Sequence, residues 1–149
     1  MKQITTACLL ALAPAITWAN IIPAGVSNSN PFVWVYDFQL SSDQSVRDGI
    51  PRVNPVPHTD LRYGAFLTLY DFAGYVGGSC TGPAHWSCSV RNAGYTPDDT
   101  MPMDRLDLVN LTWTYIGTPP ISGAPNGRSL GTFGAESIYR TETLLDYAA

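Results

Sequence analysis

The sequence predicts an all-β protein, specifically an antiparallel β-sandwich that resembles a jelly roll. Apolar and polar residues alternate in several short segments, which is the period of a half-buried strand. The 13 glycines and 12 prolines gather largely between these segments. After the first 19 residues, no window long enough for a helix keeps a helical spacing of apolar residues without a glycine or proline.

The first 19 residues have the pattern of a signal peptide. Lys2 gives a positive start, and residues 4–16 form an apolar run. Small residues follow at Thr17 and Ala19, the two positions that a signal peptidase selects. The apolar run is shorter than the roughly 20 residues that a membrane-spanning helix needs. We therefore expect cleavage after Ala19 and export of a single domain, residues 20–149.

The exported part is expected to be acidic. Lys2 is the sole lysine, so residues 20–149 carry seven arginines and twelve acidic residues, a net charge of seven minus twelve, or −5. No run of lysine or arginine is available to neutralise phosphate groups, which argues against nucleic acid and anionic membranes as partners. We expect no membrane anchor in this chain.

Cys80 and Cys88 remain after such cleavage and predict one disulfide. Exported proteins form disulfides readily, and the segment between the two cysteines contains Gly-Pro and can turn. A zinc site made of Cys80, His85 and Cys88 is the alternative. It is weaker because structural zinc needs four ligands, and His58 is the only other histidine. We expect neither a metal nor a cofactor.

The first two predicted strands are residues 32–40 and 65–72, whose aromatic and β-branched side chains suit a pleated, half-buried surface. One face of the first strand carries Phe32, Trp34, Tyr36, Phe38 and Leu40. One face of the second carries Phe66, Thr68, Tyr70 and Phe72, and the other carries Ala65, Leu67, Leu69 and Asp71. The connection between the two strands contains three prolines and is expected to be a surface excursion.

Three more strands are predicted at residues 85–90, 106–116 and 130–139. The first directs Trp86, Cys88 and Val90 to one side. The second alternates most cleanly, which predicts a buried face and a wet face; the wet face carries Asn110, Thr112 and Thr114. The third turns inward Phe133, Ala135 and Tyr139. Residues 92–104 and 117–126 are expected to be connections.

Residues 144–147 predict the beginning of a sixth strand near the end of the sequence. Five or six strands are fewer than the roughly seven or eight that complete most sandwiches. We therefore expect a domain that is incomplete at its C-terminus. Its last strand would be an unpaired edge, which favours association.

The tripeptide Tyr-Asp-Phe occurs twice, at residues 36–38 and 70–72. Each aspartate stands near the end of an apolar strand, where a short acidic side chain faces solvent or caps a turn. The flanking sequences share nothing further, which disfavours an internal repeat. A catalytic pair formed by Asp37 and Asp71 is a weaker alternative, because paired-acid chemistry needs a shared cleft.

Other chemical motifs are incomplete. Ser79 follows two glycines, but a threonine replaces the last glycine of the G-x-S-x-G elbow. A hydrolase that uses Asp37, Asp71 or Ser79 is therefore the least supported function, and no catalytic residue is assigned. Four acidic residues offer oxygen ligands for calcium, although without EF-hand spacing; they are Asp98, Asp99, Asp104 and Asp107. Asn110 begins a glycosylation acceptor, Asn-Leu-Thr, within a predicted strand.

The tryptophans decide between a buried core and a carbohydrate site. Trp34 and Trp113 lie on the apolar faces of predicted strands and are expected in the core. Trp86 follows a Gly-Pro loop and is the candidate for exposure. It is the one candidate glycan contact, because an exposed aromatic ring can stack on a sugar. A carbohydrate-binding module on a β-sandwich is therefore the alternative function.

Several segments resemble exported bacterial proteins of the PEP-CTERM group, which the exosortase system sorts. They are GAFLTLYDFAGYV at 64–76, PAHW at 83–86, GYTP at 94–97, NLTWTYIG at 110–117 and LGTFGAES at 130–137. The resemblance implies a non-enzymatic protein of the cell surface or extracellular matrix, with an extracellular polysaccharide or the surface matrix as its partner. The C-terminal sorting tail that names the group is missing before the sequence ends at Ala149.

Overall fold

The computed structural model describes residues 21–30, 32–51, 63–96, 104–140 and 146–149. The predicted signal peptide lies outside these residues. The described part contains strands and no helix, so the predicted all-β class is confirmed. The strands are β1 (Ile21–Asn30), β2 (Val33–Leu40), β3 (Ser45–Val46), β4 (Ile50–Pro51), β5 (Tyr63–Gly64), β6 (Phe66–Phe72), β7 (Trp86–Arg91), β8 (Val109–Tyr115), β9 (Ile121–Ser122), β10 (Arg128–Glu136) and β11 (Tyr147–Ala148).

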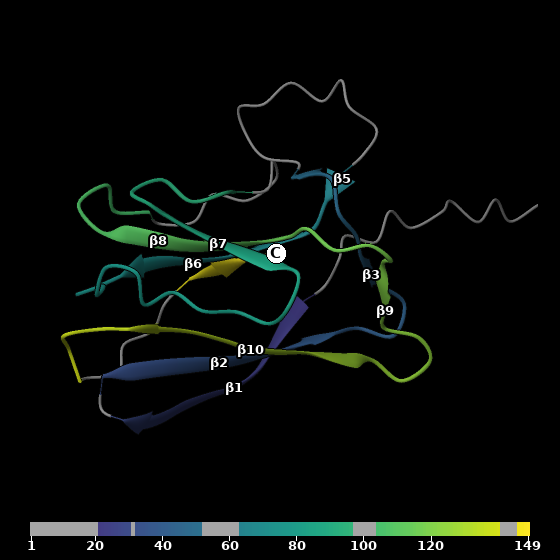
Figure 1. The fold of residues 1–149 in the computed structure, drawn as a ribbon, viewed down its shortest axis with the longest axis horizontal. Coiled ribbons are helices and arrows are strands. Elements are labelled where there is room, and N and C mark those ends of the chain that lie inside the picture. The colour runs from purple at the N-terminus through teal and green to yellow at the C-terminus, as the bar shows by residue number, and fades with distance from the viewer. Residues whose placement is uncertain (1–20, 31, 52–62, 97–103, 141–145) are drawn as a thin grey trace, which may run out of the picture.

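Two antiparallel sheets make up most of the structure. One has the strand order β1-β2-β10, and the other has the order β11-β6-β8-β7. Figure 1 shows them as two layers, with β1, β2 and β10 in one layer and β6, β7 and β8 in the other. Two short pairs lie beside them, β3 with β9 antiparallel and β4 with β5 parallel. Face-to-face sheets are the arrangement that a sandwich requires; the jelly-roll order stays a prediction.

The core lies between the two sheets and is rich in aromatic rings. Phe133 of β10 packs edge-on against Trp86 and Trp113 of the opposite sheet, with ring centroids 5.1 and 5.5 Å apart. The predicted inner face of residues 32–40 is confirmed for β2, since its even-numbered residues from Trp34 to Leu40 are all buried. Burial of one large apolar side chain contributes about 1.5–3 kcal/mol, so this cluster is a major source of stability.

The predicted strands correspond to β2, β6, β7, β8 and β10. The sixth predicted strand overlaps β11, which pairs with β6 at the edge of its sheet, while residues 141–145 lie outside the described part. β1 has no counterpart among the predictions. Its pairing with β2 shifts register between Pro23 and Gly25 and again between Ser27 and Asn30, so the sequence does not alternate regularly there.

The prediction of a wet face on residues 106–116 is wrong, because Asn110 and Thr112 of β8 are buried. Residues 92–96 cross the outer face of this sheet. The hydroxyl of Tyr70 on β6 donates to the carbonyl of Tyr95 over 2.7 Å, and the Tyr95 ring packs edge-on against Phe66. Both faces of the central strands β6 and β8 are therefore covered, which explains why β6 is buried at six of its seven positions.

The prediction that Tyr139 points inward is also wrong, since its side chain is 55% exposed. β10 ends at Glu136, and the chain then turns. The amide of Ile138 donates to the carbonyl of Gly74, and the amide of Tyr139 donates to the hydroxyl of Ser137. The alternation of β10 ends at this turn, whereas Phe133 and Ala135 are buried as predicted.

Candidate functional site

The second Tyr-Asp-Phe motif marks an irregularity in the sheet. Asp71 has a φ of 57°, a left-handed conformation that aspartate tolerates better than most residues. The pairing of β6 with β8 shifts register between Leu69 and Phe72, around this residue. The carboxylate of Asp71 accepts a hydrogen bond from the amide of Arg105 over 2.8 Å. Asp71 therefore lies at an irregularity of β6, and its carboxylate binds the backbone of the segment that precedes β8.

Asn110 lies at the centre of this polar network and is fully buried. Its side-chain oxygen accepts from the amide of Asp71 over 2.8 Å. Its side-chain nitrogen donates to the carboxylate of Asp104 over 2.9 Å and to the carbonyl of Asn92 over 3.3 Å. The glycosylation acceptor is thus inaccessible in the fold, and Asn110 instead ties together three segments of chain.

Asp37 and Asp71 do not meet. Asp37 pairs with Thr132 of β10 and lies on the outer face of the three-stranded sheet, between the buried residues Tyr36 and Phe38. Asp71 contacts Asn110, whose side chain lies on the outer face of the other sheet. Because the two outer faces point away from one another across the core, the catalytic-pair alternative is wrong.

The acidic residues proposed as calcium ligands have other partners where they are described. Asp104 accepts from Asn110, and Asp107 forms an ion pair with Arg105 in which the charged atoms are 2.8 Å apart. The hydrogen bond from Arg105 lowers the pKa of Asp107 below its ordinary value. Asp98 and Asp99 lie outside the described residues. Within the described ranges, no three acidic, histidine or cysteine side chains form a group suited to a metal ion.

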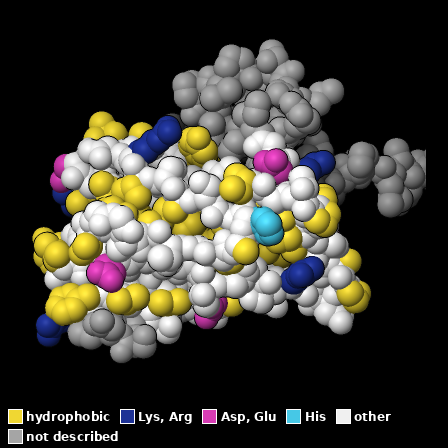
Figure 2. Space-filling view, viewed as in Figure 1, with side chains coloured by type: hydrophobic (Ala, Val, Ile, Leu, Met, Phe, Trp, Pro, Cys, Tyr) yellow, Lys and Arg dark blue, Asp and Glu magenta, His cyan; other side chains and the backbone are white. Residues whose placement is uncertain are grey.

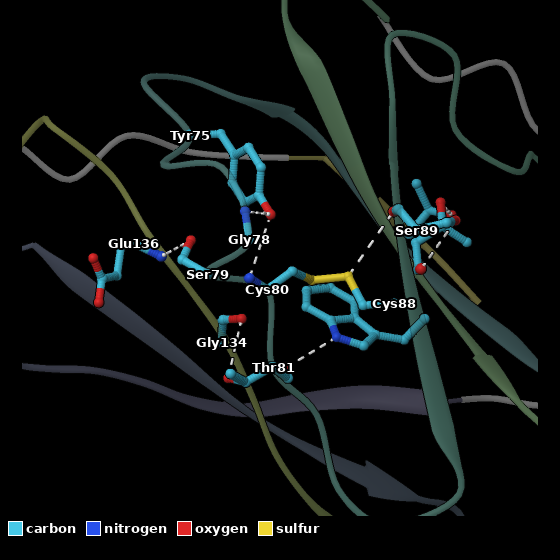
Figure 3. The surroundings of a disulfide bond; sticks show 12 residues. Tyr75, Gly78, Ser79, Cys80, Thr81, Cys88, Ser89, Gly134 and Glu136 are labelled. Carbon is cyan, nitrogen blue, oxygen red and sulfur yellow. Dashed lines mark hydrogen bonds between the residues drawn. A yellow bond between two sulfur atoms is a disulfide. The ribbon is translucent and has the colours of Figure 1, made fainter.

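Cys80 and Cys88 are joined as a disulfide, with their Cα atoms 6.3 Å apart. Figure 3 shows this bond and its surroundings. Cys88 belongs to β7, and Cys80 belongs to the loop that precedes β7. The zinc alternative with His85 is wrong for this structure, because a disulfide leaves neither sulfur available as a thiolate ligand.

Residues 75–81, here called the covering segment, run along the edge of β10 (Figure 3). Thr81 and Gly134 exchange two backbone hydrogen bonds, of 2.7 and 2.9 Å. The amide of Val76 donates to the carbonyl of Glu136 over 3.0 Å. The covering segment therefore extends the three-stranded sheet, while its disulfide connects it to the other sheet.

Ser79 has a structural position in this segment. Its hydroxyl donates to the carbonyl of Val76 over 2.7 Å and accepts from the amide of Glu136 over 2.9 Å. Figure 3 shows the Ser79 side chain directed toward Glu136. The hydroxyl thus donates to one backbone group and accepts from another, and neither partner is a general base. The hydrolase alternative therefore has no activated nucleophile at Ser79.

The prediction that Trp86 is exposed is wrong, since only 8% of its surface is accessible. Its ring packs against Tyr115 and Phe133, with centroids 5.4 and 5.1 Å away. The candidate glycan contact therefore has no free ring face for a sugar. Trp34 and Trp113 are buried as predicted, and the indole nitrogen of Trp113 donates to the carbonyl of Thr81 over 2.9 Å.

The surface of the described part is weakly charged. Figure 2 shows scattered charged side chains on one face, with small groups of apolar side chains among uncharged ones. Large apolar side chains that are exposed come from several separate elements: Ile22, Leu106, Ile116, Ile138, Tyr139 and Tyr147. In the same described ranges, no helix has the length and apolar character needed to cross a membrane.

Sequence patterns placed Asp71 near the end of a strand, where β6 ends one residue later, and named both cysteines; the weaker catalytic alternatives for Asp71 and Ser79 are not supported. They missed Asn110 as the centre of a network, although a lone amide between apolar strand residues was its one available signal. Comparison with protein-family models, with curated proteins and with solved structures finds no match to this chain.

Proposed function

We propose that this chain is an exported, non-enzymatic protein of the cell surface or extracellular matrix. The observation that carries the proposal is the disulfide between Cys80 and Cys88, which connects the covering segment at β10 to β7 of the opposite sheet. Disulfides persist in oxidising compartments outside the cytoplasm. Closing so small a loop contributes on the order of 2–3 kcal/mol, which matters in a small domain.

The positions of the polar residues favour a structural role over catalysis. Asp71, Ser79 and Asn110 each bind backbone groups of distant segments. Among the described residues, no side-chain nitrogen or oxygen that is fully shielded from solvent lacks a hydrogen-bond partner. A catalytic group needs a free direction for proton transfer, whereas the Ser79 hydroxyl both donates to and accepts from the backbone and Asn110 is fully buried.

The signal-like residues 1–19 and the resemblance to PEP-CTERM proteins support the same proposal. Strand β1 begins at Ile21, two residues after the proposed cleavage position. Cleavage after Ala19 would therefore leave the whole of β1 in the mature protein. We propose an extracellular polysaccharide or the surface matrix as the binding partner of this protein.

Export is tested by expressing the full chain in a bacterium and locating it with an antibody. We expect the protein outside the cytoplasm, with Asn20 as its first residue by N-terminal sequencing. Ala19→Asp should leave an uncleaved precursor, because a signal peptidase requires a small residue there. Trp18→Phe is the matched control and should be cleaved normally, since the position between the two small residues is not selected.

The opposite result is equally clear. If the wild-type chain is found in the cytoplasm with its first 19 residues attached, the proposal of an exported protein is wrong.

A further inference from the structure

The edge of β10 is closed by the covering segment and not by a regular strand. Gly134 uses its amide and carbonyl to bind Thr81, and the carbonyl of Glu136 accepts from the amide of Val76. The amide of Glu136 donates to the hydroxyl of Ser79 over 2.9 Å. Backbone groups that would otherwise form an open edge are thus satisfied by residues 75–81.

The residues of β10 alternate in direction. Since the amides of Gly134 and Glu136 donate to the covering segment, the amides of Phe133 and Ala135 face β2 on the other side. Hydrogen exchange at Gly134 and Glu136 therefore reports on the edge under the covering segment, and exchange at Phe133 and Ala135 reports on the edge paired with β2. This alternation supplies an internal control for any opening of the covered edge.

The covering segment contacts the opposite sheet through the ring of Tyr75, which packs edge-on against Phe72 of β6, and through two further connections. One is the covalent bond from Cys80 to Cys88 on β7. The other is the hydrogen bond from the indole of Trp113 on β8 to the carbonyl of Thr81. The hydrogen bond from Glu136 to Ser79 lies at an exposed position, where a single hydrogen bond contributes little net stability. The disulfide is thus the strongest connection that keeps this segment in place.

We propose that the Cys80–Cys88 disulfide controls, through its redox state, whether the edge of β10 is closed. A dithiol reductant transfers two electrons and two protons to the bond, which becomes two cysteine thiols, while the dithiol becomes a disulfide. Both cysteines are partly exposed, so the reductant has access. The covering segment then leaves the edge, and the backbone groups of Gly134 and Glu136 that it had paired become exposed to solvent. This inference does not depend on export.

Residue-resolved amide hydrogen exchange of the folded protein, with and without dithiothreitol, tests the proposal. Reduction should accelerate exchange at Gly134 and Glu136 by about tenfold or more, because the loop-closing constraint is lost. Exchange at Phe133 and Ala135, whose amides face β2, should change by less than about twofold. The double variant Cys80→Ser/Cys88→Ser should show the reduced pattern without reductant, and adding dithiothreitol to it should change nothing.

Two results would overturn the proposal. Unchanged protection of Gly134 and Glu136 after reduction would mean that hydrogen bonds alone hold the covering segment. Equal acceleration at all four amides, including complete unfolding, would mean that the disulfide stabilises the whole domain and does not control this edge.

Discussion

The amide of Asp71 donates to the side-chain oxygen of Asn110, although 39 positions separate the two residues in the sequence. This bond joins the irregular end of β6 to the start of β8. The same asparagine also binds Asp104 and Asn92, so one buried side chain fixes both ends of the 92–107 excursion. These polar residues thus hold the connecting segment between β7 and β8 against the outer face of the sheet.

Asn110→Ala should lower the free energy of unfolding by about 2–4 kcal/mol, because it leaves buried backbone groups without partners. Urea denaturation followed by tryptophan fluorescence measures this change. Asn126→Ala is the matched control, since Asn126 is exposed in a turn, and it should change stability by less than about 0.5 kcal/mol. Equal stability of the two variants would contradict the role assigned to Asn110.

Gly94→Ala tests whether residues 92–96 pack on the outer face of the sheet. A Cβ atom at this position would lie 2.5 Å from Thr68 and 3.2 Å from Tyr70, so we expect a loss of about 1–3 kcal/mol from overpacking. Gly77→Ala serves as the control, because a Cβ there meets nothing within 4 Å. If both variants unfold at the wild-type urea concentration, residues 92–96 do not form the close contact described.

Tyr36 makes the stability sensitive to alkaline pH. Burial raises the pKa of its hydroxyl to about 12, whereas the unfolded chain keeps a value near 10.0. The folded state therefore binds more protons between these values, and its stability is complete below pH 10 and falls by about 2–3 kcal/mol as pH rises through that window.

The variant Tyr36→Phe isolates this effect. No hydrogen bond to the Tyr36 hydroxyl is found among the described residues, so the variant should match the wild type at pH 7 and lose less stability above pH 10. Urea titrations at both pH values measure the difference. An identical alkaline decline in wild type and variant would show that other groups cause it.

Trp86→Ala should lower the free energy of unfolding by about 3–5 kcal/mol, because the indole fills the core beside Phe133 and Tyr115. Tyr139→Ala removes an exposed aromatic ring and should cost about 1 kcal/mol or less. Thermal unfolding of both variants provides the comparison. A stable Trp86→Ala variant that had lost retardation by a polysaccharide in native gels would instead support a carbohydrate-binding module.

Local alternation predicted much of the all-β fold, because it records directly which side of a strand is apolar. The inner residues of β2 and of β10 up to Ala135 follow from it. β1 does not, since Pro23 and two register shifts break its period. The pairing of Cys80 with Cys88 was predictable from the number of cysteines that remain after the predicted signal peptide, and the structure agrees.

The errors share one physical cause, which is contact between segments distant in sequence. Asn110 and Thr112 read as a wet face until residues 92–96 are placed over them. Trp86 follows a loop and reads as exposed, but its ring reaches Phe133 of the other sheet. Alternation with a period of two residues indicates which face of a strand is apolar. It does not indicate whether another segment of the chain covers the opposite, polar face.

The state of Cys80 and Cys88 in cells tests the central claim, an exported domain closed by a disulfide, most directly. Cells producing the wild type and the export-blocked deletion of residues 1–19 are quenched with acid, and free thiols are alkylated with a mass-shifting maleimide. We predict an unmodified, oxidised pair in the wild type outside the cytoplasm and two modified thiols in the deletion variant. Two modified thiols in the wild-type protein, wherever it is found, would contradict the account.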